Sequence, residues 1–239
     1  MNSYNIDITA VSENAVLLEW PEVICEMQHQ HILLCKQQIL AQYSDKIIDV
    51  IASYNSLMVY YHFEQLPLSS FISGLSKITQ MGQGFQTVAS AENALLSPVI
   101  IDIPVCYHPS LGIDIEEVAR QTNCTIAQVI KLHSDKVYNA FALGFTPGFC
   151  YLATLAKKLH LSRRENPRIA VPAGAVAIAE QQTAVYPTNS PGGWHIIGQT
   201  PIAMYQASSH EFEPTVSVGQ QVRFVPISLD DYHNMAASR

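Results

Sequence analysis

Residues 171–201 read VPAGAVAIAEQQTAVYPTNSPGGWHIIGQTP, and this stretch decides the fold of the second half of the chain. Short apolar runs alternate in it with proline and glycine turns. Many short strands separated by closely spaced turns are typical of a β-barrel or a β-sandwich. We therefore predict that the chain is all-β from Lys136 onward, with strands at 137–143, 175–179, 183–187, 194–198, 202–206, 216–219 and 221–227.

The first ninety residues mix strand and helix patterns. Helical spacing places Ile32, Cys35, Ile39 and Tyr43 on one face of a predicted helix over 24–43, with Leu33 and Leu40 beside them. Residues 69–80 form a second, weaker predicted helix. Short apolar runs predict strands at 4–11, 14–20, 47–53 and 57–63. The resulting order β-β-α-β-β-α predicts a small sheet with helices on one face.

A polar, interrupted stretch at 82–98 separates the two halves, so we predict domains at 1–90 and 91–239. The second domain begins with a strand at 99–107. Two short helices should follow it, starting at Asp114 with Glu117 and at Thr125 with Gln128. Both pairs have the spacing of a capping box.

The composition excludes several classes of protein. The 239 residues carry a net charge of −7 and no extended basic run, so no nucleic-acid partner is expected. Five scattered cysteines indicate free thiols in a reducing compartment. No apolar run approaches the roughly 18 residues of a membrane span, and the start lacks the pattern of a signal peptide. We expect a soluble, cytoplasmic protein that does not contact a membrane.

Common catalytic motifs are absent from the sequence. There is no P-loop, GxGxxG, HExxH or GxSxG pattern, and the nine histidines do not lie at metal-ligand spacings, so no metal site is expected. The turn Pro191-Gly192-Gly193 fits a type II turn, which requires positive φ at its third position and could gather backbone N–H groups into an anion-binding nest. Arg164 and Arg168 lie just upstream, and an arginine can hold a carboxylate or phosphate with two hydrogen bonds.

Each of these features also has a structural interpretation. The turn could be a hairpin corner, and Tyr186 and Trp194 could pack in the core or at its rim. His195 could be a packed, hydrogen-bonded histidine, and Arg168 could pair with a surface carboxylate. Polar side chains on constrained loops are nevertheless where binding residues tend to lie.

Three segments together resemble the signature of a known family. LGFTPGFCYL at 143–152, residues 166–201 and GQQVRFVPI at 219–227 closely resemble the allophanate hydrolase subunit 1 family. The resemblance extends over nearly the whole chain. It implies an α+β protein, in which a small N-terminal α+β sandwich domain precedes a cyclophilin-like β-barrel similar to half of the carboxyltransferase domain of urea carboxylase.

The resemblance also implies an activity and partners. The expected function is one component of an ATP-dependent 5-oxoprolinase, a cyclic amide hydrolase that opens 5-oxo-L-proline to L-glutamate and is inactive as a single chain. It would act with a second cyclophilin-like barrel protein (the C component) and a third protein (the A component). Two alternatives stay open: inhibition of a sensor histidine kinase, with Phe145, Phe149 and Tyr151 as anchors, and biotin-dependent carboxylation of an amide or urea.

An amide is a poor electrophile, so activation by ATP would replace the strong base or metal that the chain lacks, with preorganised donors stabilising the oxyanion. ATP with Mg would be used by the complex, and no cofactor is expected to bind this chain tightly. Three places depart from the family pattern: Glu180 stands where glycine is usual, Gln199 where arginine is usual, and Ser12-Glu13 where Gly-Asp is frequent. The expected catalytic residues are His195, Arg168 and Tyr186, and the expected substrate-binding residues are Gln182, Thr183, Ser190, Gly192, Gly193 and Pro172.

Overall fold

The computed structural model describes residues 4–82, 100–208 and 212–238. Contacts between Cα atoms divide the chain into two compact units, Met1–Ser97 and Pro98–Arg239. The predicted boundary at residues 90 and 91 lies outside the described residues. Within the described residues, no helix is both long enough and apolar enough to span a membrane.

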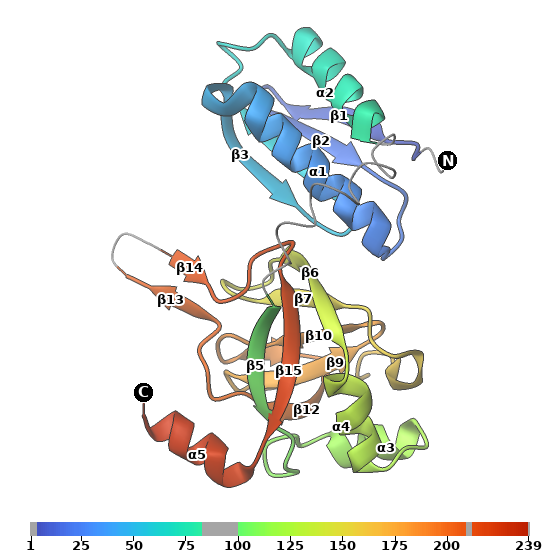
Figure 1. The fold of residues 1–239 in the computed structure, drawn as a ribbon, viewed down its shortest axis with the longest axis vertical. Coiled ribbons are helices and arrows are strands. Elements are labelled where there is room, and N and C mark those ends of the chain that lie inside the picture. Colours follow the sequence, from blue (N-terminus) through green and yellow to red (C-terminus); the bar gives the residue numbers. More distant parts are fainter. Residues whose placement is uncertain (1–3, 83–99, 209–211, 239) are drawn as a thin grey trace. The chain divides into compact units, whose positions relative to one another are not determined.

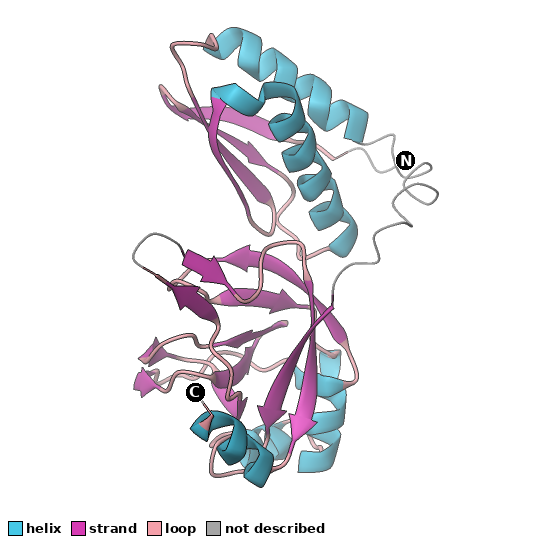
Figure 2. Cartoon of the chain, turned by 60° about the vertical axis from the view of Figure 1, so that its left-hand side comes forward, coloured by secondary structure: helices cyan, strands magenta, loops and turns pink. Residues whose placement is uncertain are grey.

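The first unit is a four-stranded antiparallel sheet with its two helices on one face (Figures 1 and 2). The strand order in the sheet is β1-β2-β4-β3, and the predicted order β-β-α-β-β-α is confirmed. Along the chain the elements are β1 (Asp7–Ser12), β2 (Ala15–Glu19), α1 (Glu26–Tyr43), β3 (Ile47–Ala52), β4 (Ser56–Tyr61) and α2 (Leu68–Gly82), with a 3-10 turn at Ser44–Lys46.

The apolar stripe of α1 forms much of the core of this unit. Ile32, Cys35 and Ile39 are fully buried, as their helical spacing predicted. The helix also buries polar groups, and His31 is satisfied by a hydrogen bond of 2.9 Å from Trp20 Nε1 to its Nδ1. Burial lowers the pKa of His31, so this ring is a neutral part of the core.

The second unit contains a closed seven-stranded barrel with strand order β10-β7-β6-β15-β5-β12-β9. The first and last of these strands in the chain, β5 and β15, are parallel neighbours (Figure 1). Closure pairs each of these seven strands on both sides, so the barrel has no free sheet edge. The α+β class and the barrel are as expected. The barrel strands are β5 (Ile100–Cys106), β6 (Val137–Leu143), β7 (Cys150–Ala153), β9 (Ala175–Ala179), β10 (Gln182–Val185), β12 (His195–Gln199) and β15 (Gln221–Ile227).

Smaller sheets and helices lie around the barrel. Two two-stranded sheets lie beside it: β8 (Arg168–Val171) with β11 (Ser190–Gly192), and β13 (Tyr205–Ala207) with β14 (Phe212–Pro214). Helices α3 and α4 pack against β12 and β15 respectively. The remaining elements are α3 (Ile115–Gln121), α4 (Ile126–Ser134), α5 (Leu229–Ala237) and a 3-10 turn at Lys157–Leu159.

One of the two predicted capping boxes forms. Thr125 Oγ1 accepts from the Gln128 backbone N–H at 3.2 Å, and Gln128 Oε1 accepts from the Thr125 N–H at 2.8 Å. The capping box at Asp114 was wrong, because this side chain makes no bond to the start of α3. Its carboxylate is instead held by the arginines described below.

Two predictions for the C-terminal part were also wrong. Residues 216–219 form a turn rather than a strand, and Gly219 has a φ of 91° that a strand does not allow. The chain beyond Lys136 is not all-β, because α5 follows the last strand. This helix begins with a capping box between Ser228 and Asp231, a pattern that the sequence displays.

Candidate functional site

Residues 162–168, here called the arginine segment, connect several of the candidate residues. The backbone carbonyl of Ser162 accepts a hydrogen bond of 2.9 Å from His195 Nε2. The backbone N–H of Arg164 donates to the Gly193 carbonyl at 2.7 Å. The backbone of the segment is therefore held along the residues that lead into β12.

Two arginines of the segment converge on one buried carboxylate, Asp114. Arg168 donates from Nη1 to Oδ2 at 2.9 Å and from Nη2 to Oδ1 at 2.6 Å, and Arg164 donates from Nη1 to Oδ1 at 3.0 Å. The backbone N–H of Ile196 adds a fourth bond to Oδ2 at 2.7 Å. Because an unpaired buried charge is costly, these bonds explain how a side chain that is only 4% exposed keeps its charge.

This geometry changes the interpretation of Arg168. The sequence suggested a catalytic arginine that holds the substrate, or one paired with a surface carboxylate. Its guanidinium instead makes both its bonds to a buried carboxylate more than 50 positions earlier in the chain. Arg168 is therefore a positioning residue that ties β8 and the arginine segment to Asp114.

His195 is buried beside the same segment. Because its Nε2 bonds to a carbonyl oxygen, Nε2 carries the proton and Nδ1 is the free acceptor. Nδ1 is buried and has no hydrogen-bond partner among the residues that the structure describes. Side chains alternate along β12, so His195 points away from the side on which Trp194 and Ile196 pack. The structure thus does not bring His195 into the cluster that holds Tyr186.

Tyr186 lies in an aromatic cluster outside the barrel interior. Its ring packs edge-on against Phe149 at 5.3 Å between centroids, and Phe149 packs likewise against Tyr151 and Trp194 at 4.8 Å and 5.9 Å. Burial raises the pKa of the Tyr186 phenol, while a hydrogen bond from the Trp194 backbone N–H and the nearby Arg163 act in the opposite direction. The phenol is therefore protonated and can donate a hydrogen bond.

The predicted turn at Gly192 was wrong. Gly192 lies in β11 opposite Arg168, and it is not among the described glycines with positive φ. A side chain is excluded there because a Cβ atom would lie 2.2 Å from Tyr186 Oη. The residue provides space for the phenol, and a type II turn that would gather an anion-binding nest is not present.

Thr183 is placed in the barrel core and cannot be reached from the surface. Its Oγ1 donates to the Ala177 carbonyl at 3.1 Å and accepts from His133 Nε2 at 2.8 Å, while Tyr107 Oη donates to His133 Nδ1 at 2.7 Å. Burial lowers the pKa of His133 to about 3, so the ring is neutral. Thr183 therefore links the His133 ring to the backbone of β9.

The other predicted binding residues lie at three places around the barrel. Ser190 is nearly buried in β11 and pairs with Val171 of β8, which the exposed Pro172 follows directly. Gly193 joins β11 to β12 and is half-buried. Gln182 begins β10, where it pairs with both β7 and β9. The small β8–β11 sheet brings Pro172 and Ser190 together, and Gln182 belongs to the barrel wall.

Two of the residues that depart from the family pattern have local explanations. Glu180 forms the tight corner between β9 and β10 with a φ of 52°, in the left-handed region that favours glycine. Gln199 donates from Nε2 to the Ala173 carbonyl at 2.8 Å and so supports the loop after β8. Neither contact requires a substrate.

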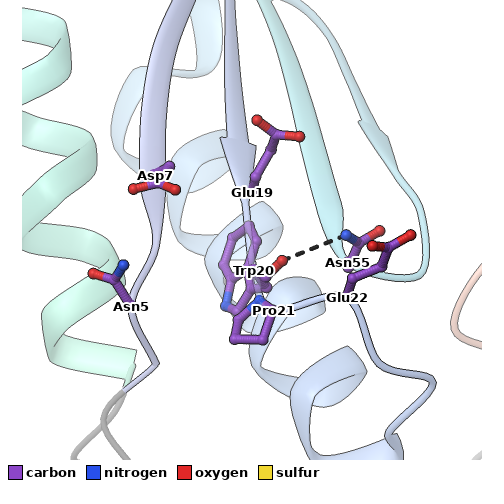
Figure 3. Close-up of a pocket in the computed structure, with 7 residues that line it drawn as sticks. All are labelled: Asn5, Asp7, Glu19, Trp20, Pro21, Glu22 and Asn55. Carbon is purple, nitrogen blue, oxygen red and sulfur yellow. Dashed lines mark hydrogen bonds between the residues drawn. The ribbon is translucent and has the colours of Figure 1, made fainter.

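Among the pockets of the described residues, two lie at 143–148 and around Trp20. Residues 143–148 and Phe212 line a largely apolar pocket of about 460 Å³, beside which Phe145 is 58% exposed. In the first unit a pocket of about 480 Å³ is lined by polar and acidic side chains around Trp20 (Figure 3). No predicted site residue lies in either pocket, and among the described residues no three His, Cys, Asp or Glu side chains are grouped to hold a metal ion.

The α+β unit followed by a closed barrel defines a class of protein. The family described as carboxyltransferase domain, subdomain C and D, matches residues 6–215, and the chain belongs to this family. Among curated proteins the chain is 34% identical over 229 residues to the B subunit of 5-oxoprolinase from Bacillus subtilis, covering 95% of each. Proteins of the same name from Haemophilus influenzae and Escherichia coli O157:H7 are 31% and 32% identical. The expected family is thereby confirmed.

Solved structures support the same fold. The protein TTHA0988 superposes with a TM-score of 0.73 at 29% identity, over 90% of this chain and 40% of that one. The chain thus spans about two fifths of that structure. The urea amidolyase of K. lactis matches 99% of this chain with a TM-score of 0.73, but at 13% identity and over 16% of its own length. That likeness concerns the fold alone.

Proposed function

We propose that the chain is the B component of an ATP-dependent 5-oxoprolinase, which opens 5-oxo-L-proline to L-glutamate. The observation that carries this proposal is the identity of 31–34% over at least 90% of the chain to three bacterial proteins named as the B subunit of 5-oxoprolinase. A protein named as a subunit works with other subunits. The partners we propose are a second barrel protein, the C component, and a third protein, the A component.

The site geometry is compatible with lactam chemistry. The Tyr186 phenol is held protonated beside Gly192 and is a hydrogen-bond donor, although its side chain is only 2% exposed. His195 presents a buried Nδ1 that has no hydrogen-bond partner among the described residues. His195 points away from the aromatic cluster that holds Tyr186. We therefore retain the two residues as separate candidate groups and not as one acid–base pair, and we assign Arg168 to positioning. The ring opening itself consumes one water and leaves a carboxylate and an amine on the same molecule. The coupled hydrolysis of ATP consumes a second water and releases ADP and phosphate.

We propose that ATP and Mg, supplied through the complex, activate the amide. The chain carries no glycine-rich phosphate-binding motif, and we propose that it binds ATP only when it is assembled. Equilibrium dialysis of labelled ATP against the single chain and against the complex tests this. Tight binding by the single chain would contradict it.

Reconstitution tests the function. The purified chain, combined with the C and A components, should form L-glutamate from 5-oxo-L-proline only when ATP is present, and omission of any one component should abolish the product. His195→Gln and Tyr186→Phe should reduce kcat at unchanged assembly. Absence of glutamate from a correctly assembled wild-type complex would overturn the proposed function.

Inhibition of a sensor histidine kinase is a second candidate, and one observation favours it. Phe145 has a φ of 69° and is 58% exposed next to the apolar pocket, as an interface anchor would be. Phe149, which the sequence also suggested, is only 2% exposed and packs within the aromatic cluster. A kinase autophosphorylation assay with this chain and with its Phe145→Ser variant distinguishes this function from the first.

A further inference from the structure

Arg163 is presented by a backbone that is held on both sides. The carbonyl of Ser162 accepts from His195, and the N–H of Arg164 donates to Gly193. The side chain of Arg163 is exposed, whereas those of the two other arginines in the segment turn inward to Asp114. The sequence does not single out Arg163, because three arginines in one short segment cannot be distinguished without their partners.

The guanidinium of Arg163 lies over the aromatic cluster. Its Cζ is 6.0 Å from the centre of the Trp194 ring. Its charge also lowers the pKa of two phenols, Tyr151 and Tyr186, against the larger effect of burial, which raises both. The charge of Arg163 thus acts on three rings, those of Trp194, Tyr151 and the candidate catalytic residue Tyr186.

The hydrogen-bonding capacity of this guanidinium is unused. A guanidinium has five N–H donors in a planar fork. In residues 4–82, 100–208 and 212–238, Arg163 makes no hydrogen bond or ion pair, while Arg164 and Arg168 share the Asp114 carboxylate. An arginine with free donors beside an aromatic cluster is suited to a small anion that also carries a flat ring.

We propose that Arg163 binds the carboxylate of the substrate and that the lactam ring lies beside Tyr151. The inference rests on the proposed function and specifies the substrate class as a small cyclic amide with a carboxylate next to the ring nitrogen. The carboxylate takes two parallel bonds from the guanidinium fork, and the flat ring contacts an aromatic face. Arg163 is then the residue that distinguishes the substrate from a plain lactam.

Kinetics of the reconstituted complex test this assignment. With Arg163→Gln the KM for 5-oxo-L-proline should rise by roughly 10-fold or more, the effect of removing a charged hydrogen-bonded contact, with a smaller change in kcat. Arg163→Lys should lie between wild type and Gln. The inhibition constant of 2-pyrrolidinone, the same ring without a carboxylate, should not change. Arg223→Gln, which alters an exposed arginine on β15, is the matched control and should behave as wild type.

The outcomes separate the two proposals. Suppose that the wild-type complex forms glutamate. The inference is overturned and the function stands if Arg163→Gln leaves the KM for 5-oxo-L-proline unchanged, or raises this KM and the inhibition constant of 2-pyrrolidinone together. The same holds if the variant fails to assemble. If the wild-type complex forms no glutamate, the function falls. The site is then judged by calorimetric titration of the complex with 5-oxo-L-proline. Binding that Arg163→Gln weakens supports the carboxylate site, and no binding to wild type, or equal binding to both, overturns it.

Discussion

At position 192 a methyl group would lie 2.2 Å from Tyr186 Oη, whereas at position 193 its nearest neighbour would be 3.6 Å away. Gly192→Ala should therefore displace the phenol and lower the free energy of unfolding by about 1–3 kcal/mol, as overpacking does. Gly193→Ala is the matched control and should change little. Chemical denaturation of both variants measures the difference, and equal effects would show that space beside Tyr186 is not the requirement.

Glu180 holds a left-handed backbone conformation at the corner between β9 and β10, with a φ of 52°. Glu180→Gly relieves this strain but makes the unfolded chain more flexible, so we expect a net stabilisation of about 0.5–1 kcal/mol. Gln181→Gly, one residue on, relieves no such strain and should destabilise. A thermal unfolding series on both variants checks the opposite signs. A destabilising Glu180→Gly would mean that the carboxylate has a role of its own.

At the scale of elements, Asp114 joins α3, the arginine segment and β12. Asp114→Asn removes the charge that two arginines share, and we expect it to cost about 3 kcal/mol of unfolding free energy, as breaking a buried ion pair does. It should also speed hydrogen exchange at the Arg164 amide. The control is Asp102→Asn, which breaks an exposed two-bond pair with Arg223 and should leave both quantities almost unchanged. Unaltered exchange in Asp114→Asn would contradict the anchoring role.

At the scale of the whole molecule, the barrel core carries a pH-dependent contribution to stability through His133. Its pKa is about 3 when folded and near the ordinary 6.5 when unfolded. Between these values the unfolded chain binds the additional proton. The stabilisation is therefore complete above pH 6.5 and is lost as the pH falls toward 3, by at most roughly 1.4 kcal/mol per pH unit.

His133→Gln should flatten this dependence, because glutamine can replace both hydrogen bonds without titrating. His233→Gln, which alters an exposed residue of α5, is the control and should keep the slope of wild type. Unfolding free energies measured from pH 7.5 to 4.5 give the three slopes. If His133→Gln and wild type have the same slope, another group causes the acid sensitivity.

Much of the fold was predictable because its signals are local. The strands at 137–143, 175–179 and 221–227 have the predicted bounds, since each is a compact run of β-branched, aromatic and small residues between turns. The cap at Thr125 also follows from neighbouring residues. The same kind of signal was present for α5 at Ser228 and Asp231, where the all-β prediction for that region was too broad.

The site was less predictable because its contacts join distant segments. From the sequence alone Arg168 could bind the substrate. In the structure its guanidinium binds Asp114, the residue that directly precedes α3. In a strand such as the one that holds Thr183, successive side chains point to opposite faces. Only closure of the barrel decides that the Thr183 hydroxyl faces His133 instead of solvent. The sequence singled out Gly192 for backbone freedom, whereas in the structure its lack of a side chain leaves the space that Tyr186 occupies.

The sequence by itself determined the family, the α+β order of the first unit and the short strands of the second, because spacing, turn residues and extended motifs act between neighbours in the chain. Only the tertiary structure decided which charged and polar groups remain available. Electrostatic and hydrogen-bond partners are chosen by distance in space, and the three arginines of the segment differ only there: Arg164 and Arg168 neutralise Asp114, and Arg163 keeps its donors free of any partner in the described parts of the chain.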